Sequence, residues 1–128
     1  KRGAYIVRKE TNRLNGIIIA TGSEVYTALD VANKLYEEKN LDIRVISMPC
    51  MELFLKQDKE YYQSLLPIGY KVVVIEASSP FSWHRFVYND NYLINVNEFG
   101  ASGKSSDVLK KYGFDFDSIK NKIENLLR

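Results

Sequence analysis

The chain has 128 residues, of which 45% are hydrophobic and 27% charged, so a single domain spanning residues 1–128 can bury a core without disulfide or metal support. The 18 Lys and Arg residues against 16 Asp and Glu leave a net charge of only +2 and no basic stripe, which argues against a nucleic-acid partner. One cysteine excludes an internal disulfide, one histidine excludes a His-based metal cluster, and no apolar run reaches the ~20 residues that cross a bilayer.

Five runs rich in β-branched or aromatic residues predict five strands, namely Tyr5–Val7, Ile17–Ala20, Ile43–Ile46, Val72–Ile75 and Tyr92–Val96. The second and fourth runs are apolar on both faces, which is typical of central parallel strands that helices cover on both sides. The link from Arg8 to Gly16 is too short for a helical crossover, so the first strand is expected to run antiparallel to the second. That short link does not establish that the two strands are neighbours.

The clearest helix is predicted between the second and third strands. Ser23 is its candidate N-cap, and Asn40 is suited to the left-handed conformation that ends a helix. Its apolar residues recur at helical spacing and are Val25, Ala28, Leu29, Ala32, Leu35 and Tyr36. Five further helices are also expected. Two short ones lie within Cys50–Leu66, one lies around Trp83–Tyr88, and one starts at Ser102 or Ser105 and ends at Gly113. The last is capped by Asp115 and buries Phe116, Ile119, Ile123, Leu126 and Leu127.

The turn after the second strand is a candidate regulatory site for an anion or a nucleotide, which is our alternative hypothesis for the function of the chain. Ligands bind at the carboxyl edge of open parallel sheets, and the N–H groups at a helix N-terminus attract anions. Gly22, Ser23 and Glu24 would line such a site together with Ser78, which follows the fourth strand. A bland alternative is that Gly22 makes a tight turn and Ser23 caps the helix. The single glycine, without the repeated glycines or the Gly-Lys-Ser of known phosphate loops, favours that alternative.

Three further polar residues are candidates for chemistry, each with a structural alternative that we prefer. Glu76 ends the fourth strand, where a carboxylate can act as acid or base but is more often bonded to backbone. His84 could shuttle protons, yet no second catalytic partner is visible, which favours a structural or interface role. Cys50 lies near the start of a short helix, and we interpret it as a small apolar residue rather than a reactive thiolate.

Aromatic residues are dense in the second half of the chain. Core packing and a docking interface both remain open for them, because interfaces are also rich in aromatic side chains. The group comprises Tyr61, Tyr62, Tyr70, Phe81, Trp83, Phe86, Tyr88 and Tyr92.

In the order and spacing of its motifs the chain resembles the C-terminal domain of transketolase, a thiamine-diphosphate enzyme. The resemblance covers essentially all 128 residues, and its specificity lies in the number and order of the matches rather than in any one motif. The matching residues are Ala20–Val25, Arg44–Pro49, Leu53-Phe54, Gln57, Tyr61, Ser64, Leu66-Pro67, Val74, Glu76-Ala77, Trp83, Phe99–Ser102 and Tyr112–Phe114.

The resemblance implies a three-layer α/β/α sandwich around a five-stranded mixed sheet, with the first strand antiparallel to the others and at an edge. It implies that the domain supports packing and dimerisation in a cytoplasmic enzyme of the pentose phosphate pathway, which transfers two-carbon ketol units between sugar phosphates. Thiamine diphosphate and a divalent metal, Mg or Ca, would lie in the other domains of that homodimer. We therefore carry over no catalytic, cofactor-binding or metal-binding residue to this chain, and expect it to be inactive alone.

The chain departs from the family pattern in two places. Gly103-Lys104 stands where the family commonly has Ala-Pro, so the entry into the following helix is expected to be looser. The segment Ser78–Ser82 lacks the glycine expected just before the tryptophan. The chain starts at Lys1 rather than Met, which we interpret as a sign of a processed chain or an excised fragment. The sequence does not distinguish between sugar substrates or between oligomeric states of the isolated domain.

Overall fold

The computed structural model describes residues 2–76, 81–95 and 116–128. The predictions made for Ser78, for Val96, for the helix after Ser102 or Ser105, for Gly103-Lys104 and for the Asp115 cap lie outside these residues.

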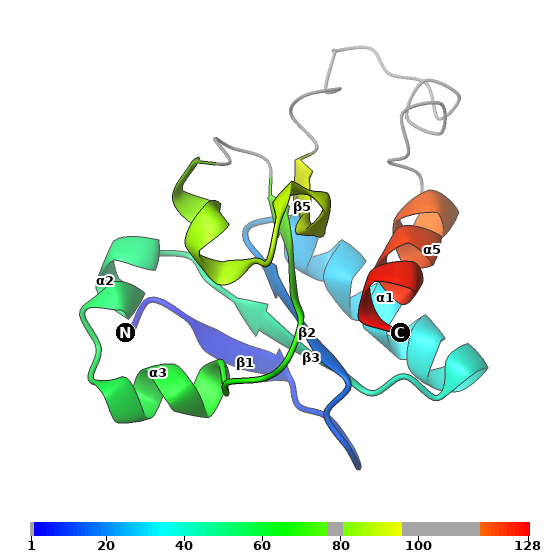
Figure 1. The fold of residues 1–128 in the computed structure, drawn as a ribbon, viewed down its shortest axis with the longest axis horizontal. Coiled ribbons are helices and arrows are strands. Elements are labelled where there is room, and N and C mark those ends of the chain that lie inside the picture. The colour runs from blue at the N-terminus through cyan, green and yellow to red at the C-terminus, as the bar shows by residue number, and fades with distance from the viewer. Residues whose placement is uncertain (1, 77–80, 96–115) are drawn as a thin grey trace.

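A five-stranded mixed sheet forms the middle of the molecule (Figure 1). β1 pairs antiparallel with β3, and the pairs β2–β3, β2–β4 and β4–β5 are parallel. The prediction that the first strand is antiparallel, at an edge and apart from the second is therefore confirmed. In the spatial order β1-β3-β2-β4-β5, the strands are β1 (Tyr5–Arg8), β2 (Gly16–Ala20), β3 (Ile43–Ser47), β4 (Val72–Glu76) and β5 (Leu93–Asn95).

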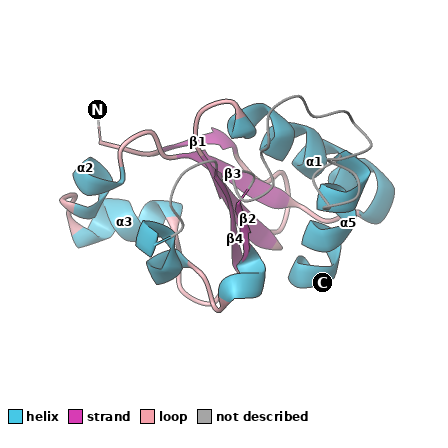
Figure 2. Cartoon of the chain, turned by 90° about the horizontal axis from the view of Figure 1, so that it is seen from above, coloured by secondary structure: helices cyan, strands magenta, loops and turns pink. Residues whose placement is uncertain are grey.

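Helices cover both faces of the sheet, as Figure 2 shows from above, and the three-layer α/β/α prediction is confirmed. Side chains alternate along each strand, so Ile18 packs on one face while Ile17 and Ile19 pack on the other. The face of Ile18 is covered by α1 (Glu24–Lys39) and α5 (Phe116–Leu127). The opposite face is covered by α2 (Met51–Leu55), α3 (Lys59–Leu65) and the 3₁₀ helix η1 (Phe81–Phe86). A short 3₁₀ turn, η2 (Asp90–Tyr92), precedes β5.

The long helix α1 forms as predicted except at its start. Ala28, Ala32 and Leu35 are buried, and Asn40 ends the helix in the left-handed conformation, with φ 57°. Ser23 holds the N-cap position as predicted, but its side chain makes no capping hydrogen bond, so that part of the prediction is wrong. Its own backbone is helical, and its hydroxyl donates to the Glu24 carboxylate at 3.3 Å instead. Carbonyls of the preceding turn accept the first N–H groups of the helix, which leaves the serine hydroxyl no capping role.

Two later elements differ in detail from their predictions. The helix expected around Trp83–Tyr88 is a 3₁₀ helix that begins at Phe81, and Tyr92 closes η2 before the strand begins at Leu93. The Asn89 side chain accepts a hydrogen bond from the Asn91 N–H at 2.8 Å, which favours the turn over an extended start of the strand.

Buried Asp42 holds the link between β1 and β2 in place. Its carboxylate accepts hydrogen bonds from the backbone N–H groups of Thr11, Asn12 and Arg13 at 2.6–3.2 Å, and from the Arg8 guanidinium at 3.3 Å. Burial alone would raise the pKa of Asp42, but these hydrogen bonds outweigh it and lower the pKa. Because the folded pKa is depressed, this stabilisation is present above the unfolded pKa and is lost as the pH falls through the folded value.

Candidate functional site

The carboxyl edge of the sheet brings Gly22 and Glu76 to the same end of the fold. Ala20 is in register with Ile75 in the parallel β2–β4 pair, so Gly22 just after β2 and Glu76 at the end of β4 lie at one edge. Gly22 has a φ of 60°, and Ser23 is exposed beside it. The Glu24 carboxylate lies in the first turn of α1, where its negative charge competes with any incoming anion. Ser78 lies outside the described residues, and the anion site stays a prediction.

Glu76 is fully buried at the end of β4, in register with Asn95 of β5. A buried carboxylate at a strand end fits a structural role as well as a chemical one. An acid–base role for Glu76 therefore stays a prediction.

His84 forms a surface pair with Asp90. The distance between His84 Nε2 and Asp90 Oδ1 is 2.7 Å, and the side chains are 46% and 85% exposed. The pair joins η1 to η2, which agrees with the structural role preferred for this histidine. At such exposure a pair of this kind contributes at most about 1 kcal/mol.

The structure divides the aromatic residues between core and surface. Trp83 and Phe86 are buried, with ring centroids 6.1 Å apart, and Tyr92 is buried on the other face of the sheet. Tyr88 is 86% exposed and Tyr70 is 43% exposed, so these two side chains remain available to an interface. The Phe81 side chain lies outside the described part of the chain.

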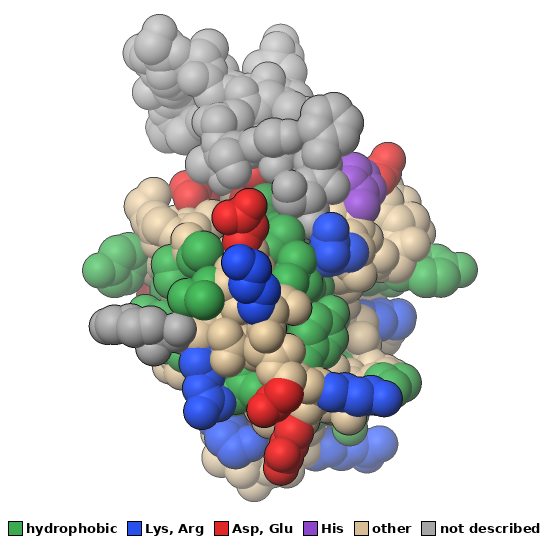
Figure 3. Space-filling view, turned by 90° about the vertical axis from the view of Figure 1, so that its left-hand side faces the viewer, with side chains coloured by type: hydrophobic (Ala, Val, Ile, Leu, Met, Phe, Trp, Pro, Cys, Tyr) green, Lys and Arg blue, Asp and Glu red, His purple; other side chains and the backbone are tan. Residues whose placement is uncertain are grey.

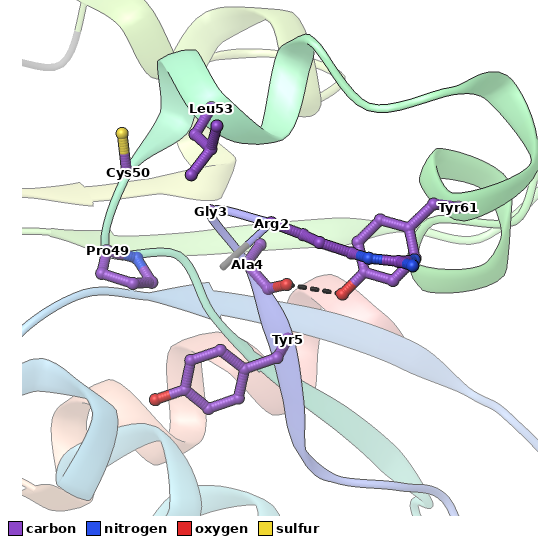
Figure 4. Close-up of a pocket in the computed structure, with 8 residues that line it drawn as sticks. All are labelled: Arg2, Gly3, Ala4, Tyr5, Pro49, Cys50, Leu53 and Tyr61. Atoms are coloured by element: carbon purple, nitrogen blue, oxygen red, sulfur yellow. Dashed lines mark hydrogen bonds between the residues drawn. The ribbon is translucent and has the colours of Figure 1, made fainter.

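A surface pocket of about 610 Å³ opens beside the N-terminal arm, Arg2–Ala4 (Figure 4). Figure 3 faces the side that carries α2 and α3, and hydrophobic side chains gather between charged ones there. Cys50 is exposed at the rim of the pocket. This does not agree with our interpretation of it as a small apolar residue, because such cysteines are usually buried. The pocket is lined by Arg2, Gly3, Ala4, Tyr5, Pro49, Cys50, Leu53 and Tyr61.

The arm is held tightly against this pocket by features that local sequence patterns did not reveal. Gly3 has a φ of 88°, and a Cβ atom there would lie 2.3 Å from the Cys50 carbonyl oxygen. The Cys50 N–H donates to the Gly3 carbonyl at 3.1 Å, and the Tyr61 hydroxyl donates to the Ala4 carbonyl at 2.7 Å. The only hint in the sequence was a glycine just ahead of the first strand.

Buried Arg44 is a second feature that the patterns missed. It lies in β3 and is 5% exposed, and its guanidinium makes two hydrogen bonds of 2.9 Å to the Glu10 carboxylate. It also donates to the carbonyls of Ser64 and Leu65 at the end of α3. The sequence signal that could have predicted this buried and paired side chain is a charged residue inside an otherwise apolar strand. Through Arg44 the β1–β2 link, the sheet and α3 are tied together.

Within the described ranges no three His, Cys, Asp or Glu side chains gather in a way that could hold a metal ion. In the same part of the chain no helix is both long and apolar enough to cross a membrane.

Residues 3–115 match the family model of the transketolase-like TK C-terminal domain. The chain belongs to this family. It is 39% identical over 127 residues to a transketolase of Staphylococcus epidermidis, which covers 98% of the chain and 19% of that protein. It is 38% identical over 124 residues to a transketolase of Aquifex aeolicus, covering 96% of the chain and 18% of the relative. The solved transketolase from Leishmania mexicana superposes with a TM-score of 0.81 at 36% identity, over 98% of this chain and 18% of that one. This transketolase C-terminal domain thus spans less than a fifth of the relatives that it matches.

Proposed function

We propose that this chain is the C-terminal domain of a larger transketolase, in which it supports domain packing and dimerisation without supplying catalytic groups. The proposed parent enzyme transfers two-carbon ketol units between sugar phosphates and uses thiamine diphosphate with a divalent metal. The observation that carries the proposal is the family match over residues 3–115 in a chain that spans only 19% of its transketolase relatives.

The buried charged side chains are paired within the domain, which supports a structural role. Asp42 is bonded to backbone N–H groups and Arg8, and Arg44 is bonded to Glu10 and to two carbonyls. Mg²⁺ and Ca²⁺ need several oxygen ligands, but the carboxylates of Asp42 and Glu10 already accept hydrogen bonds from arginine side chains or backbone N–H groups. Asp42 and Glu10 therefore do not fit the divalent metal, and we assign no step of the ketol chemistry to them.

Removing this domain from the full-length enzyme tests the supporting role. We expect the truncated enzyme to dissociate into monomers at concentrations where the intact enzyme is dimeric, because the proposed packing surface is lost. Sedimentation over a range of concentrations gives the dimer dissociation constant, and ketol transfer is measured on the same samples. Activity should fall with the dimer fraction and return as the concentration rises.

Adding the 128-residue chain back as a separate molecule is the matched control, and it should restore part of the dimer. An unchanged dimer dissociation constant after truncation contradicts the supporting role. So does a stable dimer without activity, because the domain would then supply something the chemistry needs.

A further inference from the structure

The pocket beside the N-terminal arm is largely apolar although it opens at the surface. Pro49 and Cys50 lie on one side of the arm and Tyr61 on the other, with Ala4 between them and the Cys50 sulfur pointing outward (Figure 4). Arg2 carries the one charge among its described lining residues, and its guanidinium lies 4.5 Å from the centre of the Tyr61 ring. This cation–π contact turns the charge toward the ring. The pocket therefore suits apolar side chains better than a charged small molecule.

The arm that forms one wall of this pocket has a fixed path. Gly3 and Ala4 are buried, and hydrogen bonds from the Cys50 N–H and the Tyr61 hydroxyl hold their carbonyls. Any chain that continues beyond Arg2 toward the N-terminus must therefore start at the rim of the pocket. Such a segment is tethered beside the pocket, so its effective concentration there is high.

The sheet edge beside the pocket is also uncovered among the described residues. β1 lies at the edge of the sheet, and no described strand pairs with its outer side. Proteins usually cover or blunt such edges, because their free N–H and C=O groups recruit other chains. Tyr5 of this strand lines the pocket and is 53% exposed. An apolar pocket that continues into an open strand edge is typical of a docking surface.

The family match indicates which part of a longer protein would lie next to the arm and the pocket. The relatives are much longer than this chain, and the matching family is that of a C-terminal domain. In a protein of that plan the preceding polypeptide joins this domain through the N-terminal arm. The arm and the pocket thus face the rest of the enzyme.

We propose that the pocket receives apolar side chains of the segment that precedes residue 1 in the full-length transketolase, and that this contact docks the domain onto the preceding one. The inference rests on the proposed function, since it needs a larger parent chain. It goes further by assigning the contact to the surface formed by Arg2–Tyr5, Pro49–Leu53 and Tyr61.

Cys50 provides a native reporter for this contact. It is the single cysteine of the chain and is exposed at the pocket rim, so iodoacetamide should alkylate it readily in the 128-residue protein. In the full-length enzyme the docked segment should slow alkylation by about tenfold or more, because thiol reactivity requires access. Mass spectrometry of the tryptic peptide 45–56, which contains Cys50 and no other cysteine, follows this thiol even if the parent holds others.

The matched control is Tyr26→Cys in a Cys50→Ser background, because Tyr26 lies on α1 and is 73% exposed. Slower alkylation of Cys50 with a smaller change at the control position supports the docking surface. An unchanged Cys50 rate, or equal slowing at both positions, overturns it. A ketol-transfer assay on the same full-length sample separates the two proposals: an active enzyme with a fully reactive Cys50 refutes the pocket contact and leaves the proposed function standing.

Discussion

Replacing Gly3 with alanine is expected to lower the free energy of unfolding by about 3 kcal/mol, and to loosen the arm that lines the pocket. The residue has a φ of 88°, where a Cβ atom is strained in any surroundings. The added Cβ would also lie 2.3 Å from the Cys50 carbonyl oxygen and 2.4 Å from the Phe54 nitrogen. Both are backbone atoms at α2, so the contact cannot be relieved by turning a side chain. Urea unfolding followed by circular dichroism measures the loss.

Gly69→Ala is the matched control for this effect. Gly69 has a φ of 101°, but a Cβ atom there would meet nothing within 4 Å. Only the conformational strain remains, for which we expect a loss of about 1–2 kcal/mol. Equal losses for the two variants would show that the close approach between the arm and α2 contributes nothing.

Replacing Arg44 with methionine is expected to destabilise the fold by about 3 kcal/mol near neutral pH, because it leaves Glu10 charged and partly buried with only the exposed Lys9, at 3.3 Å, as its cation. The Glu10 side chain is only 14% exposed, and the carbonyls of Ser64 and Leu65 lose their donors as well. Burial tends to raise the pKa of Glu10, but the hydrogen bond from Arg44 helps to outweigh it, and the pKa is lowered. Urea unfolding at several pH values measures both the loss and its pH dependence.

The sign of that pH dependence follows from the lowered pKa. In the wild type, the Glu10 contribution is present above the unfolded pKa and is lost as the pH falls through the folded value. Without Arg44, burial still raises the pKa of Glu10, and only the backbone hydrogen bond and the Lys9 hydrogen bond remain to lower it. The difference in stability between wild type and Arg44→Met should therefore shrink as the pH is lowered from neutral toward about 3.

The double variant Glu10→Leu with Arg44→Met separates the ion pair from simple packing. Replacing both partners removes the unpaired carboxylate, so it should recover part of the loss of the single variant. A double variant as unstable as the single one would show that the lost carbonyl contacts or a cavity, rather than the unpaired charge, cause the effect.

The sheet was predictable from sequence because its signals are local. The β-branched runs marked the strands, and the short Arg8–Gly16 link gave the antiparallel direction of β1. The helix cap at Ser23 failed because capping depends on the backbone conformation of one residue, which the preceding turn decided. The same holds for the 3₁₀ turn before β5, where a side-chain hydrogen bond of Asn89 favours the turn.

The pocket and the buried charges were beyond prediction because each joins distant segments. Tyr61 bonds Ala4 across 57 positions, and Arg44 bonds Glu10 across 34. No periodicity or motif reports such pairs, and they become visible only once the topology places α3 beside the arm. The family resemblance supplied the strand order at the edge but said nothing of these contacts.

A ketol-transfer assay of the 128-residue chain alone, with sugar phosphates, thiamine diphosphate and Mg²⁺, tests most directly whether this domain supports the enzyme or performs its chemistry. We predict no turnover above background for the isolated chain, and turnover for the full-length enzyme under the same conditions. Turnover by the isolated chain would contradict the supporting role, because this domain would then have to bind the cofactor and carry out the transfer by itself.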